Sequence, residues 1–127
     1  MSWKYFSYET DPKLACSLTG ERKMNDEFMG KLDLLRERYG KPITITSGYR
    51  SPEYNSQVSS TGETGPHTTG RAVDIAVHSS RERSELMRIL LHPDSPFTRV
   101  TPAKSFIHID DLTEEDGFAE NVMWWYG

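Results

Sequence analysis

The sequence predicts an α+β domain in which helices flank a small, largely antiparallel sheet. A chain of 127 residues suits one domain, so we expect residues 1–127 to form a single unit. Segments with helical periodicity alternate with short runs of β-branched residues. The connections between these segments are too uneven in length for a regular parallel sheet.

The first half of the chain carries one long helix signal. Asn25 or Asp26 can cap a helix whose apolar positions share one face, and Gly40 ends it after Tyr39. Pro52 suits the first position of a second, shorter helix. The predicted elements are an extended entry or short strand over 3–7, a helix over 26–39, a strand over 42–48 and a short helix over 51–58.

The second half alternates loop, strand and helix. A helix begins at Ser79 or Ser80, and the segment HPDSP ends it. A turn at Pro102 separates two further strands. The predicted elements are a loop over 59–70, strands over 71–77, 97–100 and 105–110, a helix over 79–91, and a helix or strand in the aromatic tail, 118–127.

Composition excludes several function classes. The net charge of −4 comes from mixed acids and bases without a basic stripe, so we expect no nucleic-acid partner. No apolar run approaches the roughly 20 residues of a membrane helix, and the segment MSWKYFSYET does not resemble a secretory signal. We therefore expect cytoplasmic synthesis. The single cysteine, Cys16, forms no internal disulfide and is interpreted as a core residue rather than a catalytic thiol.

An acid interrupts the apolar strand RAVDIAV. Alternate side chains of a strand share one face, so Val73 and Ile75 point to the core while Asp74 points to the opposite side. A buried carboxylate without a partner is costly, so Asp74 must be hydrogen-bonded, paired with a cation or bound to a metal. The segment FIHID repeats the pattern, with His108 and Asp110 on the face opposite its isoleucines.

His67 lies in the loop that leads into the first of these strands, so His67, Asp74 and His108 are candidate ligands of one zinc ion with an open fourth position. Other interpretations stay open. A lone histidine in a strand is often a surface or core residue, and Asp74 could cap a turn or pair with Arg71 or Arg50.

Three motifs, HTTGRAVD, FIHID and ITSGYRSPEYN, resemble those of the zinc D-Ala-D-Ala carboxypeptidase and L-alanyl-D-glutamate endopeptidase family. The resemblance runs from about Phe28 to Asp110. It implies the hedgehog/DD-peptidase fold, one Zn²⁺ per chain and cleavage of peptide bonds in peptidoglycan stem peptides. In this reading His67, Asp74 and His108 hold the zinc.

The resemblance also assigns substrate contacts. Arg50 would bind a substrate carboxylate or peptide carbonyl through its planar fork, unless it forms a structural salt bridge to Asp74 or Glu53. Ser47 and Tyr49 are further candidates for substrate binding, although Tyr49 also suits the core. Asn55 would tie the short helix to the arginine loop.

The chain departs from the family pattern at two positions. Relatives place an acid three residues before the last histidine ligand, where this chain has Ser105. Asp110 is the best local replacement as the general base, and it could equally orient His108 through its ring N–H. This feature is similar to that of a family branch ending in His-x-Asp. Gly65 stands where relatives have Ser or Thr, which removes a hydrogen-bonding hydroxyl.

Short relatives without a signal sequence are common in phage genomes, so the resemblance suggests a phage-encoded, monomeric endolysin. Such an enzyme would act at the cell wall after lysis or as a virion component. The alternative is a non-catalytic, zinc-bearing binding or virion/tail module of the same fold, which the missing acid at Ser105 favours.

Overall fold

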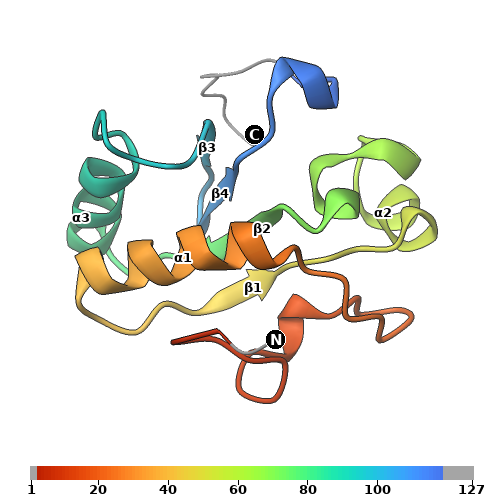
Figure 1. Ribbon diagram of the computed structural model, residues 1–127, viewed down its shortest axis with the longest axis horizontal. Helices are drawn as coiled ribbons and strands as arrows, with labels where there is room; N and C mark the ends of the chain where they lie inside the picture. Colours follow the sequence, from red (N-terminus) through yellow and green to blue (C-terminus); the bar gives the residue numbers. More distant parts are fainter. Residues whose placement is uncertain (1–2, 119–127) are drawn as a thin grey trace.

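The computed structural model describes residues 3–118 and contains an antiparallel sheet in the order β1-β2-β4-β3 with helices around it (Figure 1). The α+β prediction is confirmed. The helices and strands are α1 (Asp26–Tyr39), β1 (Ile45–Ser47), α2 (Pro52–Val58), β2 (Ala72–Ala76), α3 (Ser80–Leu90), β3 (Arg99–Pro102) and β4 (Phe106–Asp110).

The helices begin where capping chemistry predicts. The Asn25 side chain accepts a hydrogen bond from the Phe28 backbone N–H at the start of α1. Ser51 and Ser79 cap α2 and α3 in the same way. Gly40 ends α1 in the left-handed conformation that its missing Cβ permits.

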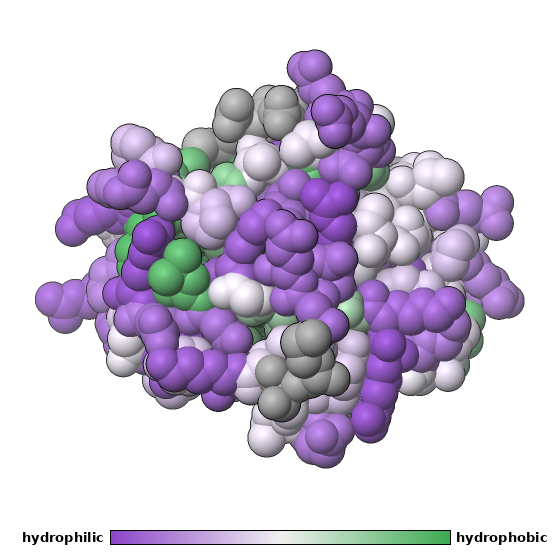
Figure 2. Space-filling model, in the orientation of Figure 1, coloured by the Kyte–Doolittle hydropathy of each residue, from purple (hydrophilic) through white to green (hydrophobic). Residues whose placement is uncertain are grey.

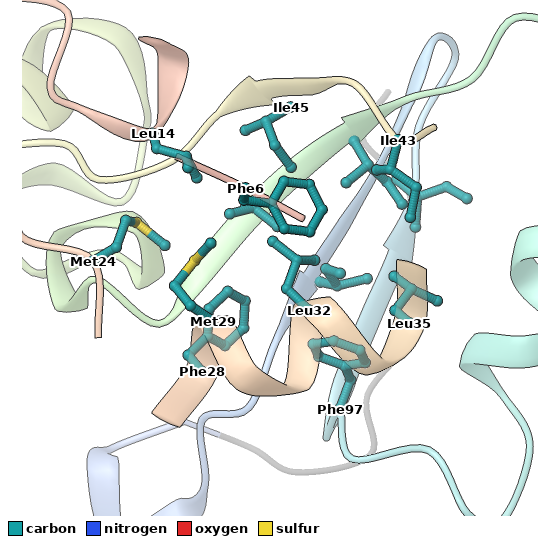
Figure 3. Packing of buried hydrophobic residues seen from close by; sticks show 14 of the residues in the cluster. Phe6, Leu14, Met24, Phe28, Met29, Leu32, Leu35, Ile43, Ile45 and Phe97 are labelled. Carbon is teal, nitrogen blue, oxygen red and sulfur yellow. The ribbon is translucent and has the colours of Figure 1, made fainter. Parts of the chain in front are cut away.

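The hydrophobic core lies between α1 and one face of the sheet (Figure 3). Phe28 and Leu32 point from the helix toward the strands and are fully buried. The sheet contributes the residues that strand alternation assigns to the core, namely Val73, Ile75, Ile107 and Ile109. Hydrophilic side chains predominate on the face of the molecule that carries the outer side of α1 (Figure 2).

The opposite face of the sheet is polar and arranged in rows. In the first row, His108 of β4 pairs with Asp74 of β2 on one side and Thr101 of β3 on the other. In the next row, Asp110 pairs with Ala72 and Arg99. The register between β2 and β4 is regular over five residue pairs, so no bulge displaces these side chains.

Some predicted elements differ from those observed. Residues 3–7 contain a bend at Lys4 and Tyr5 and no strand. β1 is shorter than predicted, and its pairing with β2 is irregular between Ile45 and Ser47. The loop 59–70 contains two 3₁₀ turns. The prediction for the aromatic tail falls on residues 119–127, outside the described residues. Within the described part, no helix is long and apolar enough to cross a membrane.

Gly70 connects the loop to β2 through a close backbone approach. Its φ is +74°, and a Cβ atom at this position would lie 2.1 Å from the Lys23 carbonyl oxygen. The Gly70 carbonyl in turn accepts a hydrogen bond from the Asn25 backbone N–H. The loop that carries His67 is thereby joined to the start of α1.

We expect Gly70→Ala to destabilise the fold more than Gly40→Ala. Both glycines have positive φ, which costs an alanine about 1–2 kcal/mol, but a Cβ at Gly40 meets nothing within 4 Å. The clash at Gly70 should add about 1–3 kcal/mol. Denaturant unfolding with a chelator present measures both variants, and equal losses would contradict the importance of this approach.

Candidate metal centre

Three side chains from separate elements meet on the polar face of the sheet. His67 comes from the 3₁₀ turn Pro66–Thr69, Asp74 from the middle of β2 and His108 from the middle of β4. One ligand atom from each lies within 4.8 Å of the other two, and all three residues are buried. The structure thus brings together the three residues that the sequence nominated.

The orientation of His67 is fixed by a backbone carbonyl. Its Nδ1 lies 2.8 Å from the Gly48 oxygen, which can only accept, so Nδ1 carries the proton. The other nitrogen, Nε2, therefore faces Asp74 Oδ1 at 3.3 Å, and a metal ion bound there would take the place of its proton. Position 48 strongly favours glycine, because a Cβ atom there would lie 2.7 Å from the Leu14 backbone.

His108 is held between two carboxylates. Its Nδ1 lies 3.0 Å from Asp74 Oδ1, and its Nε2 lies 2.7 Å from Asp110 Oδ2. Nε2 can donate to Asp110, while Nδ1 faces the same Asp74 oxygen as Nε2 of His67, and a metal ion would take the place of the proton on Nδ1. Each histidine thus has one nitrogen held by the protein and one turned toward Asp74.

These contacts shift the titration of the three groups. Burial raises the pKa of Asp74, but the charge and hydrogen bonds of His67 and His108 lower it by a larger amount. The pKa of Asp74 is therefore lower than its usual value. Burial lowers the pKa of His67 more than Asp74 raises it. Burial also lowers the pKa of His108, yet its hydrogen bonds to Asp110 and Asp74 leave a net increase. Asp74 is therefore ionised, as a metal ligand must be.

The donor set fits zinc. Two imidazole nitrogens and one carboxylate oxygen are typical of catalytic zinc sites, which keep a fourth position open. Tetrahedral ligands about 2.0–2.1 Å from the metal lie about 3.3 Å from one another. The separations of 3.3 Å and 3.0 Å to Asp74 Oδ1 lie close to that value, and all three ligand atoms lie within 4.8 Å of one another, so the arrangement is compatible with one shared ion.

Arg50 lines the same hollow as His67 and Asp74. Its Nε donates to Ser47 Oγ at 3.2 Å and its Nη1 donates to Asn55 Oδ1 at 3.1 Å, while Nη2 lies 3.8 Å from Asp74 Oδ2. These contacts hold the guanidinium still and leave N–H groups for a ligand. The hollow, about 260 Å³ in volume, is lined by Arg50, Val58, Ser59, Ser60, Thr61, Pro66, His67, Asp74 and Phe106.

The other nominated residues near the hollow have different surroundings. Ser47 supports Arg50, and Asn55 ties α2 to the arginine loop as predicted. Tyr49 is a correction to the predicted substrate contacts, because it packs in the hydrophobic core and does not line the hollow. Cys16 also lies in the core, and the exposed His78 takes no part in the cluster.

Asp110 lies behind His108 and outside the hollow. It is fully buried, and its carboxylate contacts the far nitrogen of His108 and the Leu112 backbone N–H. It is absent from the lining of the hollow. The contacts favour the alternative in which Asp110 orients His108, because two residues along a strand place it one row behind the ligands. Ser105, in the turn before β4, is exposed and also outside the hollow.

The structure explains why position 65 is a glycine. A Cβ there would lie 2.0 Å from Thr61 Oγ1 and 2.7 Å from Asn55 Nδ2. Thr61 Oγ1 accepts a hydrogen bond from Asn55 Nδ2 at 2.8 Å and lines the hollow. The Thr61 hydroxyl therefore fills the space that a serine or threonine side chain at position 65 would need.

Sequence reasoning missed three supports of the site. The Gly48 carbonyl holds His67, and the Thr61 hydroxyl accepts a hydrogen bond from Asn55. Arg99 forms an ion pair with Asp110 on the neighbouring strand. The glycines at positions 48 and 65 were the sequence signal for the contacts of Gly48 and Thr61. Arg99 gave no signal, because its partner depends on the strand order.

Comparison with known proteins places these residues in a family context. A family model described as Peptidase M15 matches residues 6–110, which include every candidate ligand and Arg50. No match was found among curated proteins.

We expect the chain to bind one zinc ion through His67, Asp74 and His108, with a rise in unfolding temperature as zinc is added. His67→Ala should lose most of this binding and stay folded, because the core lies on the other face of the sheet. His78→Ala is the matched control, since His78 is exposed and outside the cluster. Elemental analysis and thermal unfolding with a chelator measure the effect, and equal zinc content in both variants would refute the ligand set.

Asp110→Asn should weaken zinc binding by about 10-fold or more, because ligand-orienting carboxylates typically contribute 10- to 100-fold in metal affinity. Asp111→Asn is the control, since the buried Asp111 pairs with Lys31 and Arg71. Competition with a chromophoric chelator gives the dissociation constants. Unchanged zinc affinity in Asp110→Asn, with hydrolysis lost, would restore the general-base role.

Proposed function

The chain belongs to the peptidase M15 family, a family of zinc metallopeptidases, and from this we propose that it cuts peptide bonds in peptidoglycan stem peptides. The observation that carries the proposal is the shared hollow. Two of the three candidate ligands, His67 and Asp74, line the same small cavity as a fixed guanidinium, so one peptide could contact both.

His67, Asp74 and His108 would hold the zinc, and Asp110 and the Gly48 carbonyl would keep both imidazoles in position. When bound, zinc would polarise the scissile carbonyl and lower the pKa of an attacking water. Asp74 and His108 come from a sheet packed on its own core, and the Gly48 carbonyl holds His67, so the site is arranged before substrate arrives. Such preorganisation avoids the cost of arranging the groups during the reaction.

Arg50 would anchor the substrate. Stem peptides carry free carboxylates and D-residue carbonyls, and a guanidinium can hold either through two parallel hydrogen bonds. Ser47 and Asn55 already take one N–H each, which aims the remaining donors into the hollow. A terminal carboxylate on Arg50 would give D,D-carboxypeptidase cleavage, and a side-chain carboxylate or carbonyl would suit an L-Ala-D-Glu endopeptidase.

The second candidate function is a zinc-bearing binding module for the same peptides. Among the described residues, Asp74 is the only acid that lines the hollow, and it is a candidate ligand. General-base catalysis typically contributes 10²- to 10⁴-fold, so a site without a separate proton acceptor would turn over slowly or not at all.

The biological setting is part of the proposal. A peptidoglycan peptidase works at the cell wall, and the resemblance to short phage-encoded relatives favours an endolysin or virion component. We propose that the chain acts there as a monomer with the stem peptide as its ligand.

Purified peptidoglycan incubated with the zinc-loaded protein should release cleaved stem peptides. Free D-alanine would identify a carboxypeptidase, and new amino termini on D-glutamate would identify the endopeptidase. Arg50→Lys should raise KM by roughly 10-fold, because a point charge cannot copy the guanidinium fork. Arg22→Lys is the control, since Arg22 is exposed and pairs with Glu9 at the surface.

Peptide binding without cleavage by the zinc-loaded wild type would favour the binding module. Neither binding nor cleavage would refute both candidates for this substrate class.

A further inference from the structure

Arg99 and Asp110 form an ion pair directly behind the candidate metal centre. They are opposite each other in the pairing of β3 with β4, and Arg99 Nε lies 3.3 Å from Asp110 Oδ2. The same Asp110 oxygen lies 2.7 Å from His108 Nε2. Three charged or ionisable groups thus follow one another across two rows of the sheet, from Arg99 through Asp110 to His108.

This pair is shielded from solvent. Arg99 is 7% exposed and Asp110 is fully buried. The Phe118 ring covers the guanidinium, with its centroid 4.8 Å from Cζ. In a dry environment a charge without a partner is expensive, so each charge depends on the other.

We propose that Arg99 is a positioning residue for the zinc ligand His108, acting through Asp110. The proposal rests on the metal site described above and on no particular substrate. The guanidinium offsets the charge of Asp110 and keeps its carboxylate directed at His108 Nε2. His108 is then held with Nδ1 toward the metal position.

The ion pair indicates how Arg99 acts. Arg99 Nε lies 3.3 Å from Asp110 Oδ2, so the proposal requires a positive charge opposite Asp110. A lysine at this position should replace much of that charge. An uncharged side chain of similar length should not.

The experiment compares zinc affinity in four proteins: wild type, Arg99→Met, Asp110→Asn and the double variant. Arg99→Met should raise the zinc dissociation constant by about 10-fold, within the range for groups that orient metal ligands. In the Asp110→Asn background the same change should have little further effect, because the residue through which Arg99 acts is already altered. Equal effects in both backgrounds, or no effect in either, would overturn the proposal.

Two further variants separate positioning from general stability. Arg99→Lys should bind zinc within about 3-fold of wild type, and a loss as large as that of Arg99→Met would refute the charge mechanism. Arg71→Met removes other ion pairs, to Asp111 and Asp116, and should lower the free energy of unfolding while leaving zinc affinity unchanged. If it weakens zinc as much as Arg99→Met, the effect of Arg99 is only structural.

The absorption spectrum of the Co²⁺-loaded protein provides a readout of ligand geometry. It should change in Arg99→Met and stay close to wild type in Arg71→Met. These measurements need no peptidase activity, so they remain decisive if the peptidoglycan proposal fails.

Discussion

The site depends on one buried negative charge. Asp74 is 6% exposed in a strand whose neighbouring residues belong to the core. A carboxylate in this place must be compensated, and both imidazoles and the Arg50 guanidinium are arranged around it. The need to compensate Asp74 explains why His67, His108 and Arg50 converge from three parts of the chain.

Strand pairing in the sheet fixes where the side chains around Asp74 lie. Antiparallel pairing places His108 opposite Asp74, and the regular register leaves no freedom for either side chain to change face. The next row repeats the arrangement with Asp110 and Arg99. The candidate ligand His108 and the carboxylate that orients it, Asp110, are thus two residues apart on β4, about 6.6 Å along the strand.

Much of this arrangement was predictable because it follows from local rules. Strand alternation alone separated Asp74 and His108 from the core residues, and capping residues fixed the helix starts. The role of Asp110 was harder, since spacing along a strand does not say which group its carboxylate contacts. Arg99 could not be linked to Asp110 without the order β1-β2-β4-β3, which is a long-range property. The contact of Thr61 with the space beside Gly65 likewise depends on how the loop folds back.

The departures from the family pattern leave the three candidate metal ligands unchanged. The Thr61 hydroxyl lies beside Gly65 on the wall of the hollow, and Ser105 is exposed outside the hollow. His67, Asp74 and His108 retain their mutual geometry because the sheet and the Gly48 carbonyl fix them independently of that wall. The contacts that hold the candidate ligands are therefore separate from the departures at positions 65 and 105. Changes at these two positions would alter substrate handling or turnover and leave the candidate metal ligands in place.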